Sequence, residues 1–409
     1  MNLLQSVLRT RRVLKHLAPY ALAISLAACG GGQNWGSSPG SGASGGGGSG
    51  GGTGGGAYSL AQRTLPAAYT NAKAINYSPY RAAGPGSEVP TDGQILQDLQ
   101  LLNDAGFTLL RLFGADAVST AILRVAQANQ ATLPNLRFQL GIYLFGLSVA
   151  EQATCTTAAN TTQIQTGISL AGTYSNVVAV SVGNETSFFA AYMPVNCLKS
   201  YITTVKQNVA QPVTADDDYT FYAGQSGGTE IPDTVLPLLD FVSIHTYPFS
   251  NYGRWDYQQL GVAAGDARAA AMMNAALAQA QASYSQVATY IYAHGAPAGL
   301  PITVGETGWK ARVTNPANPL EGTVAVPVAA APINAKYYYD LMNTWQAGGA
   351  GPKTIFYFEA FDEAWKNTDD GWGLWDASRA PRYALCGTAV PSAAACTSPN
   401  PYTGAGYYP

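Results

Sequence analysis

Short apolar runs alternate with amphipathic segments along most of this chain. Eight runs rich in Val, Ile, Leu, Phe and Tyr occupy residues 74–77, 107–113, 136–143, 177–182, 213–215, 240–245, 302–305 and 354–358. Continuous apolar runs of this kind are typical of parallel strands that are buried on both faces. We therefore predict eight strands, of which the fifth is the shortest.

The segments between these runs have helical periodicity. One helix is predicted after Thr91-Asp92 and before Gly106, with its apolar face formed by Ile95, Leu96, Leu99 and Leu102. A second has a stripe at spacings of three and four, formed by Val195, Leu198, Ile202, Val205 and Val209. Eight strand–helix repeats predict an α/β fold, a (β/α)8 TIM barrel, and fit it better than a doubly wound sheet.

Two glutamates follow predicted strands directly. Glu185 comes after the fourth strand and Glu306 after the seventh. In such barrels the chemistry lies where strands end, so both carboxylates are expected at one rim. Glycoside hydrolysis needs such a pair, and a separation of about 5 to 5.5 Å gives retention of configuration. Their proximity should raise the pKa of one carboxyl while the other stays ionised.

The sequence lacks the residues that other common kinds of catalysis require. A serine triad needs a histidine base, but only His245 and His294 follow the N-terminal segment. Phosphate loops and metal-ligand clusters are also missing from the sequence, so we expect no cofactor and no metal. With 21 basic and 24 acidic residues, the chain has no basic footprint for nucleic acid.

The N-terminal segment predicts export. Residues 1–28 combine basic residues with an apolar run too short to span a bilayer, as in a signal peptide. The sequence L-A-A-C-G at residues 26–30 resembles a bacterial lipobox, which implies a lipid anchor on Cys29; the alternative is an ordinary signal peptide with an unrelated cysteine. Residues 29–57 would be a Gly/Ser-rich tether. We expect a monomer in the bacterial cell envelope, periplasmic or surface-exposed, with the outer membrane favoured.

Four further cysteines predict two disulfides. In an exported protein an even number of cysteines suggests pairing, and the local choice is Cys155 with Cys197 and Cys386 with Cys396. Other pairings stay open at this point. The predicted organisation is thus a barrel domain over residues 58–385, followed by a disulfide-closed tail over residues 386–409.

Five sequence motifs together resemble glycoside hydrolase family 17, the β-1,3-glucanases. They are V-G-N-E at 182–185, G-E-T-G-W at 305–309, I-N-Y-S-P-Y-R at 75–81, H-T-Y-P-F at 245–249 and F-Y-F-E-A-F-D-E-A-W-K at 356–366. The motifs run in order from the first strand to the last. The resemblance implies a retaining barrel glycosidase acting on β-1,3-glucan.

The resemblance also implies roles for single residues. Glu185 would be the acid/base and Glu306 the nucleophile. Asn184 would bind the sugar 2-hydroxyl, and Tyr247 would donate its phenol to Glu306. Glu363 and Lys366 would support the catalytic pair; alternatively, they form only a structural ion pair. For His245, a core hydrogen bond and a sugar contact are both open.

A glucan cleft usually carries exposed aromatic rings that stack on sugars. The candidates at strand ends are Tyr77, Phe113, Tyr143, Trp309, Trp365, Trp372 and Trp375. Of these we predict that Tyr77, Trp309 and Trp365 line the cleft. Two alternative functions stay open: a transglycosylase that uses the same glutamates, and a glucan-binding lipoprotein without turnover.

Overall fold

The computed structural model describes residues 58–189, 193–225, 232–250, 262, 266–318, 321, 329–388 and 396. The predicted signal peptide, Cys29 and the Gly/Ser tether lie outside these residues. None of the described helices is long and apolar enough to cross a membrane.

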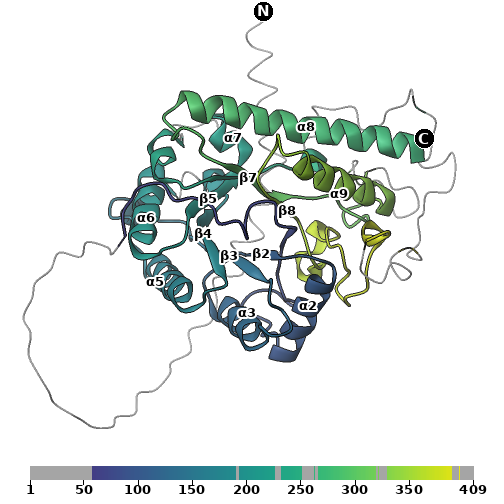
Figure 1. The fold of residues 1–409 in the computed structure, drawn as a ribbon, viewed down its shortest axis with the longest axis horizontal. Coiled ribbons are helices and arrows are strands. Elements are labelled where there is room, and N and C mark those ends of the chain that lie inside the picture. Colours follow the sequence, from purple (N-terminus) through teal and green to yellow (C-terminus); the bar gives the residue numbers. More distant parts are fainter. Residues whose placement is uncertain are drawn as a thin grey trace, which may run out of the picture.

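Eight parallel strands form a closed barrel in sequence order, β1 to β8 (Figure 1). They are β1 (Ala74–Asn76), β2 (Leu109–Leu112), β3 (Arg137–Ile142), β4 (Val177–Asn184), β5 (Val213–Asp218), β6 (Val242–His245), β7 (Ile302–Thr307) and β8 (Ile355–Tyr357). The barrel closes through parallel pairing of β1 with β8. The predicted (β/α)8 barrel is therefore confirmed.

Helices surround the barrel (Figure 1). They are α2 (Asp92–Asp104), α3 (Ala117–Ala128), α4 (Val149–Gln152), α5 (Ala158–Thr173), α6 (Val195–Asn208), α7 (Tyr219–Tyr222), α8 (Asp266–Ala293) and α9 (Pro332–Ala347). Short 3-10 helices lie between them: η2 (Thr186–Phe189), η3 (Pro232–Thr234), η4 (Leu236–Leu238), η5 (Pro248–Ser250), η6 (Ala364–Asp369) and η7 (Tyr383–Leu385). Among the described residues, the connections after β5 and β8 carry only single turns, so the eight repeats are less regular than predicted.

The predicted helix at residues 91–106 is α2. The Thr91 side chain accepts a hydrogen bond from the Gln94 amide, and Gln94 reaches back to the Thr91 amide, which forms a capping box. Ile95, Leu99 and Leu102 are fully buried. The predicted stripe of α6 is likewise buried at Leu198, Ile202, Val205 and Val209.

The fifth strand is longer than predicted. It continues through Asp216, Asp217 and Asp218, beyond the predicted end at residue 215. Three consecutive aspartates argue against a strand by propensity, but hydrogen bonds inside the barrel satisfy Asp216 and Asp217, and both are buried. Tertiary contacts thus outweigh local propensity at this strand.

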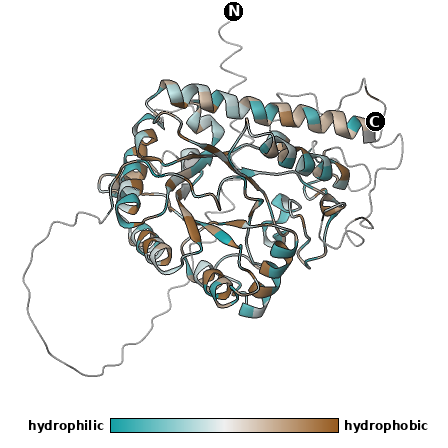
Figure 2. Ribbon diagram, viewed as in Figure 1, coloured by the Kyte–Doolittle hydropathy of each residue, from teal (hydrophilic) through white to brown (hydrophobic). Residues whose placement is uncertain are grey.

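The barrel interior is unusually polar. Figure 2 shows hydrophilic positions within strands that are otherwise hydrophobic. The buried polar residues of the strands include Asn76, Arg111, Gln139, Thr214, Asp216, Ser243 and Thr303. A separate apolar cluster at the amino-terminal ends of several strands contains Leu65, Tyr69, Ala74, Leu109, Phe241 and Phe356. The polar interior therefore lies between this apolar cluster and the opposite rim.

Both predicted disulfides are confirmed. Cys155 pairs with Cys197, with their Cα atoms 5.0 Å apart, and Cys386 pairs with Cys396 at 4.7 Å. The first joins the end of the α4 segment to α6, and the second closes the start of the C-terminal tail. Each constrains the unfolded chain and so stabilises the fold.

Candidate active site

The two predicted catalytic glutamates lie together at the carboxyl ends of β4 and β7. His245, the last residue of β6, lies between them: its Nδ1 is 2.9 Å from Glu185 Oε1 and 3.7 Å from Glu306 Oε2. One ligand atom from each of the three side chains lies within 4.8 Å of the others. Glu185 and Glu306, which are 121 positions apart in sequence, thus share one small site.

Glu306 is held by three groups. Tyr247 donates its phenol to Oε2 at 2.6 Å, as the family resemblance implies, and Arg111 Nη1 donates to Oε1 at 2.5 Å. Burial raises the pKa of Glu306, but the charges of His245 and Arg111 and these hydrogen bonds outweigh it and lower the pKa below its ordinary value. Glu306 is therefore the carboxylate that stays ionised near neutral pH.

An unusual backbone conformation positions Glu185. Its φ of 51° lies in the left-handed region, which costs a non-glycine residue about 1 kcal/mol or more. The surroundings hold it there: its amide donates to the carbonyl of Asp216 at 2.9 Å. The next residues, Thr186 and Ser187, donate to the buried Asp217 carboxylate. The side chain is 27% exposed, so it can reach a bound molecule.

His245 is charged in this site. Burial lowers its pKa, but Glu306, together with the hydrogen bond and charge of Glu185, raises it to about 9. A protonated imidazole donates from Nδ1 to Glu185. Of the two interpretations left open for His245, the structure shows a hydrogen bond within the site.

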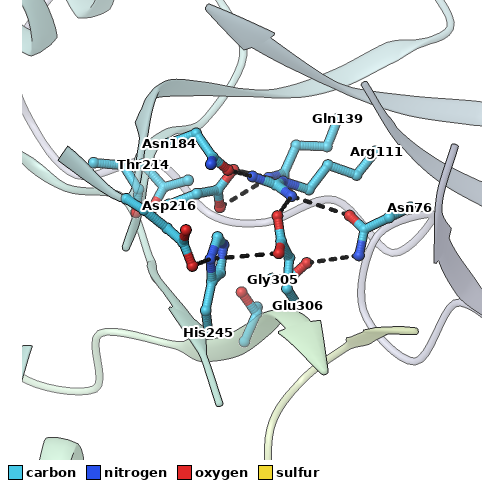
Figure 3. Close-up of polar contacts among 12 residues, drawn as sticks. Asn76, Arg111, Gln139, Asn184, Thr214, Asp216, His245, Gly305 and Glu306 are labelled. Carbon is cyan, nitrogen blue, oxygen red and sulfur yellow. Dashed lines mark hydrogen bonds and ion pairs between the residues drawn. The ribbon is translucent and has the colours of Figure 1, made fainter. Parts of the chain in front are cut away.

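Arg111 is the central residue that sequence reasoning missed. It lies within β2, is 1% exposed, and joins Glu306 to three other side chains (Figure 3). Its Nε donates to Asp216 at 2.7 Å, Nη1 to Asn76 at 3.1 Å and Nη2 to Asn184 at 2.6 Å. The sequence did offer one signal, a single arginine inside an apolar strand. A charge buried there requires polar partners, so Arg111 pointed to a polar site inside the barrel.

Gly305 allows these side chains to converge. A Cβ at this position would lie 2.4 Å from Ser243 Oγ and 3.1 Å from Asp216 Oδ1, which is closer than atoms pack. Its carbonyl accepts a hydrogen bond from Asn76 Nδ2 at 3.2 Å. The glycine before Glu306 is therefore a steric requirement of the site.

The predicted aromatic lining is mostly wrong. Tyr77 and Trp309 are 1% and 0% exposed, so neither ring can stack on a sugar. Tyr77 donates to Asp98, and Trp309 packs against Phe249 and donates its indole N–H to a main-chain carbonyl. Both lie just beyond the observed ends of β1 and β7, where the alternation that orients side chains no longer holds.

Three other candidate rings are better placed. Trp365 is half-buried and lies against Gly84, where a Cβ would come within 2.6 Å of its ring. Phe113 and Tyr143 are also half-buried, at the ends of β2 and β3. Burial, followed by the charge of Glu185, raises the pKa of Tyr143.

Glu363 and Lys366 form an ion pair with a third residue. Lys366 contacts Glu363 and lies 3.5 Å from Glu359, and both glutamates are buried. Lys366 also lies 4.7 Å from the centre of the Phe358 ring, whose edge contacts Tyr247. The predicted pair thus forms beside the site, and a direct role toward substrate stays a prediction.

Glu185, His245 and Glu306 could also hold a metal ion. The guanidinium of Arg111, 2.5 Å from Glu306, opposes a second cation there. Hydrolysis by two carboxylates needs no metal. The prediction that no metal is required can be checked by chelation.

Comparisons with known proteins agree with this geometry. The model of the BtgE/BtgC glycoside hydrolase domain matches residues 74–374. An endo-laminarinase from Formosa Hel1_33_131 is similar in structure, with a TM-score of 0.64 and 20% identity over 78% of this chain and 86% of that one. A β-glucuronidase from Ruminococcus gnavus has a TM-score of 0.53 and 12% identity over 78% and 48%. No curated protein sequence matches the chain. At these identities the structural likenesses show the fold.

Proposed function

Because this chain belongs to the family of the BtgE/BtgC glycoside hydrolase domain, we propose that it is a retaining glycosidase that cleaves β-1,3-glucan. One observation carries the proposal: an oxygen of Glu185 and an oxygen of Glu306 lie within 4.8 Å of each other. This spacing suits direct attack by one carboxylate and leaves too little room for the water that an inverting enzyme places between them.

In the first step Glu306 attacks the anomeric carbon while Glu185 transfers a proton to the departing glycosidic oxygen. The bond between the anomeric carbon and that oxygen breaks, and a covalent glucosyl-enzyme forms. Tyr247 and Arg111 hold the Glu306 carboxylate ionised and aimed. His245 then stabilises the carboxylate that Glu185 has become.

In the second step Glu185 acts as a base. It takes a proton from water as the water oxygen attacks the anomeric carbon, and Glu306 is released. Asn184, fixed through Oδ1 by Arg111, is next to Glu185 and is the proposed partner of the sugar 2-hydroxyl. The exposed fraction of Glu185 allows water or an acceptor to reach it.

The substrate proposal rests on sequence motifs. The V-G-N-E and G-E-T-G-W motifs resemble those of glycoside hydrolase family 17, to which we propose that the chain is related. A similar structure belongs to an enzyme described as an endo-laminarinase. We therefore propose internal cleavage of β-1,3-linked glucose polymers.

Transfer to a second sugar is an alternative outcome of the same chemistry. We propose that Tyr143, which is half-buried just after β3, offers the aromatic surface on which an acceptor sugar stacks. A sugar held there in place of water would lengthen the product instead of hydrolysing it. This would use the same two glutamates.

Incubation with a defined β-1,3-linked oligosaccharide, followed by product sizing, tests the proposed function. Shorter products support hydrolysis, and products longer than the substrate indicate transfer. A Glu306→Gln variant and a chelator-treated sample serve as controls for the site and for metal dependence. Failure to alter the oligosaccharide would refute the proposed substrate.

We also propose that the domain works close to a membrane. The L-A-A-C-G motif at residues 26–30 supports a lipid on Cys29, and the Gly/Ser-rich tether would let the barrel reach about 30 Å from the anchor. Glucan in the cell envelope would then be within its range.

A further inference from the structure

An unbroken chain of side-chain hydrogen bonds runs through the barrel to the nucleophile. Tyr69 donates to Gln139 Oε1 at 2.6 Å, and Gln139 Nε2 donates to the two oxygens of Asp216 at 3.2 and 3.1 Å. Asp216 accepts from Arg111, which donates to Glu306. Figure 3 shows the part of this chain from Gln139 to Glu306.

We propose that Tyr69 and Gln139 are positioning residues for Glu306, acting through Asp216 and Arg111. The proposal rests on the proposed retaining mechanism, in which Glu306 is the nucleophile. It assigns a role in catalysis to a residue in the apolar cluster at the amino-terminal strand ends, opposite the rim that carries the glutamates.

Tyr69 is rigidly placed. It is 0% exposed, and its ring packs edge-on against Phe241 and Phe356, with ring centres 5.2 and 5.9 Å away. Its single phenol proton is donated to Gln139 Oε1 at 2.6 Å.

The hydrogen bond from Tyr69 fixes the orientation of the Gln139 amide. Its oxygen accepts from Tyr69, so its NH2 group must face Asp216. Asp216 is then held on one side by Gln139 and on the other by Arg111 Nε, 2.7 Å away. With Nε fixed, the planar guanidinium can direct Nη1 only toward Glu306 and Asn76, and Nη2 toward Asn184.

Removal of the Tyr69 hydroxyl should disturb the positions of Gln139, Asp216 and Arg111. In Tyr69→Phe, the buried Gln139 oxygen loses its donor, which is costly. Only the bonds to Asp216 then hold the Gln139 amide, so its position becomes less fixed. Arg111 would lose its fixed position, and its effect on Glu306 would weaken. We expect kcat to fall about tenfold with KM little changed.

The test measures the pKa of Glu306 without substrate. The side-chain carboxyl carbons of 13C-glutamate-labelled protein are titrated by NMR, and Glu306 is assigned with a Glu306→Gln variant. Arg111 lowers the pKa of Glu306, so Tyr69→Phe and Gln139→Leu should both raise it. In an Arg111→Lys background, Tyr69→Phe should raise the pKa of Glu306 little further, because both changes act through the same chain of hydrogen bonds.

Tyr290→Phe is the matched control. Tyr290 donates its phenol to Asp233 at 2.8 Å outside the barrel, so this variant loses a similar hydrogen bond far from the site. It should leave kcat and the pKa of Glu306 unchanged. If Tyr69→Phe lowers only the melting temperature, or if its effect adds fully to that of Arg111→Lys, the positioning role is wrong. A wild-type enzyme that leaves β-1,3-glucan intact would instead refute the proposed function, because the titration does not depend on turnover.

Discussion

The two glutamates proposed to be catalytic differ in what surrounds them. Glu306 is buried among Tyr247, Arg111 and His245, whereas Glu185 is partly exposed and contacts His245. These environments separate a fixed, ionised carboxylate from one that exchanges protons with substrate and water. Such a separation is what acid/base and nucleophile roles require.

We expect Glu306→Gln to lower turnover by more than about a thousandfold, because an amide cannot form the covalent intermediate. Folding and glucan binding should persist, since the amide keeps the shape of the side chain. Glu151→Gln, in α4 outside the barrel, is the control and should be fully active. Oligosaccharide hydrolysis and calorimetric binding check both. Retained hydrolysis would remove Glu306 from the nucleophile role.

His245 should make stability depend on pH. Its pKa is raised to about 9 in the folded state, from an ordinary value of 6.5. A raised pKa stabilises the folded state fully below pH 6.5, and this contribution disappears as the pH rises through 9. We therefore expect the difference in unfolding free energy between wild type and His245→Gln to shrink over that range. Denaturant titrations at pH 6 and pH 10 measure it, and a constant difference would argue against a charged His245.

Sequence reasoning reached the two glutamates and Tyr247, but it did not reach Arg111 and Asp216. Glu185 and Glu306 were predictable because each acid directly follows an apolar strand. Arg111 and Asp216 lie inside strands, where only the fold shows that their charges meet. Tyr77 and Trp309 were misplaced because nothing in the sequence states which way a side chain points beyond a strand end.

At the scale of elements, β7 carries a strict steric requirement at Gly305. Gly305→Ala would place a Cβ 2.4 Å from Ser243 Oγ, so the strand or its neighbours must shift. We expect about 1 to 3 kcal/mol of lost stability, as for other overpacked sites. Turnover should fall at least about tenfold, because Asp216 and His245 lie against the same position.

Gly172→Ala provides the comparison for that variant. Gly172 is exposed in α5, and a Cβ there meets nothing within 4 Å. Stability should be unchanged or slightly higher, because alanine favours helix, and activity should be unaffected. Melting temperatures and kcat for the two variants check the contrast. Equal effects would show that Gly305 has no special role.

The elements themselves were largely predictable. All eight apolar runs became strands, because buried parallel strands are distinguished by continuous hydrophobicity. The exception is the carboxyl end of β5, where the strand extends through Asp216 to Asp218, beyond the predicted end at residue 215. Their strand conformation depends on partners from β2, β3 and the segment after β4, which no local pattern reveals.

At the scale of the whole molecule, the barrel, tether and anchor form one functional unit in our account. We expect Cys29→Ser to release the protein from membranes, because it removes the sulfur that would carry the lipid. Membrane fractionation of wild type and variant checks this. The purified domain should keep its activity in both cases. Unchanged fractionation would refute the lipid anchor.

The central claim is that Glu185 and Glu306 act on opposite sides of one glycosidic bond with retention of configuration. NMR spectroscopy of the first products formed from a β-1,3-linked glucose oligosaccharide tests it most directly, because the new reducing end shows its anomeric form before it equilibrates. Our account predicts that the β-anomer appears first. Initial formation of the α-anomer would contradict it.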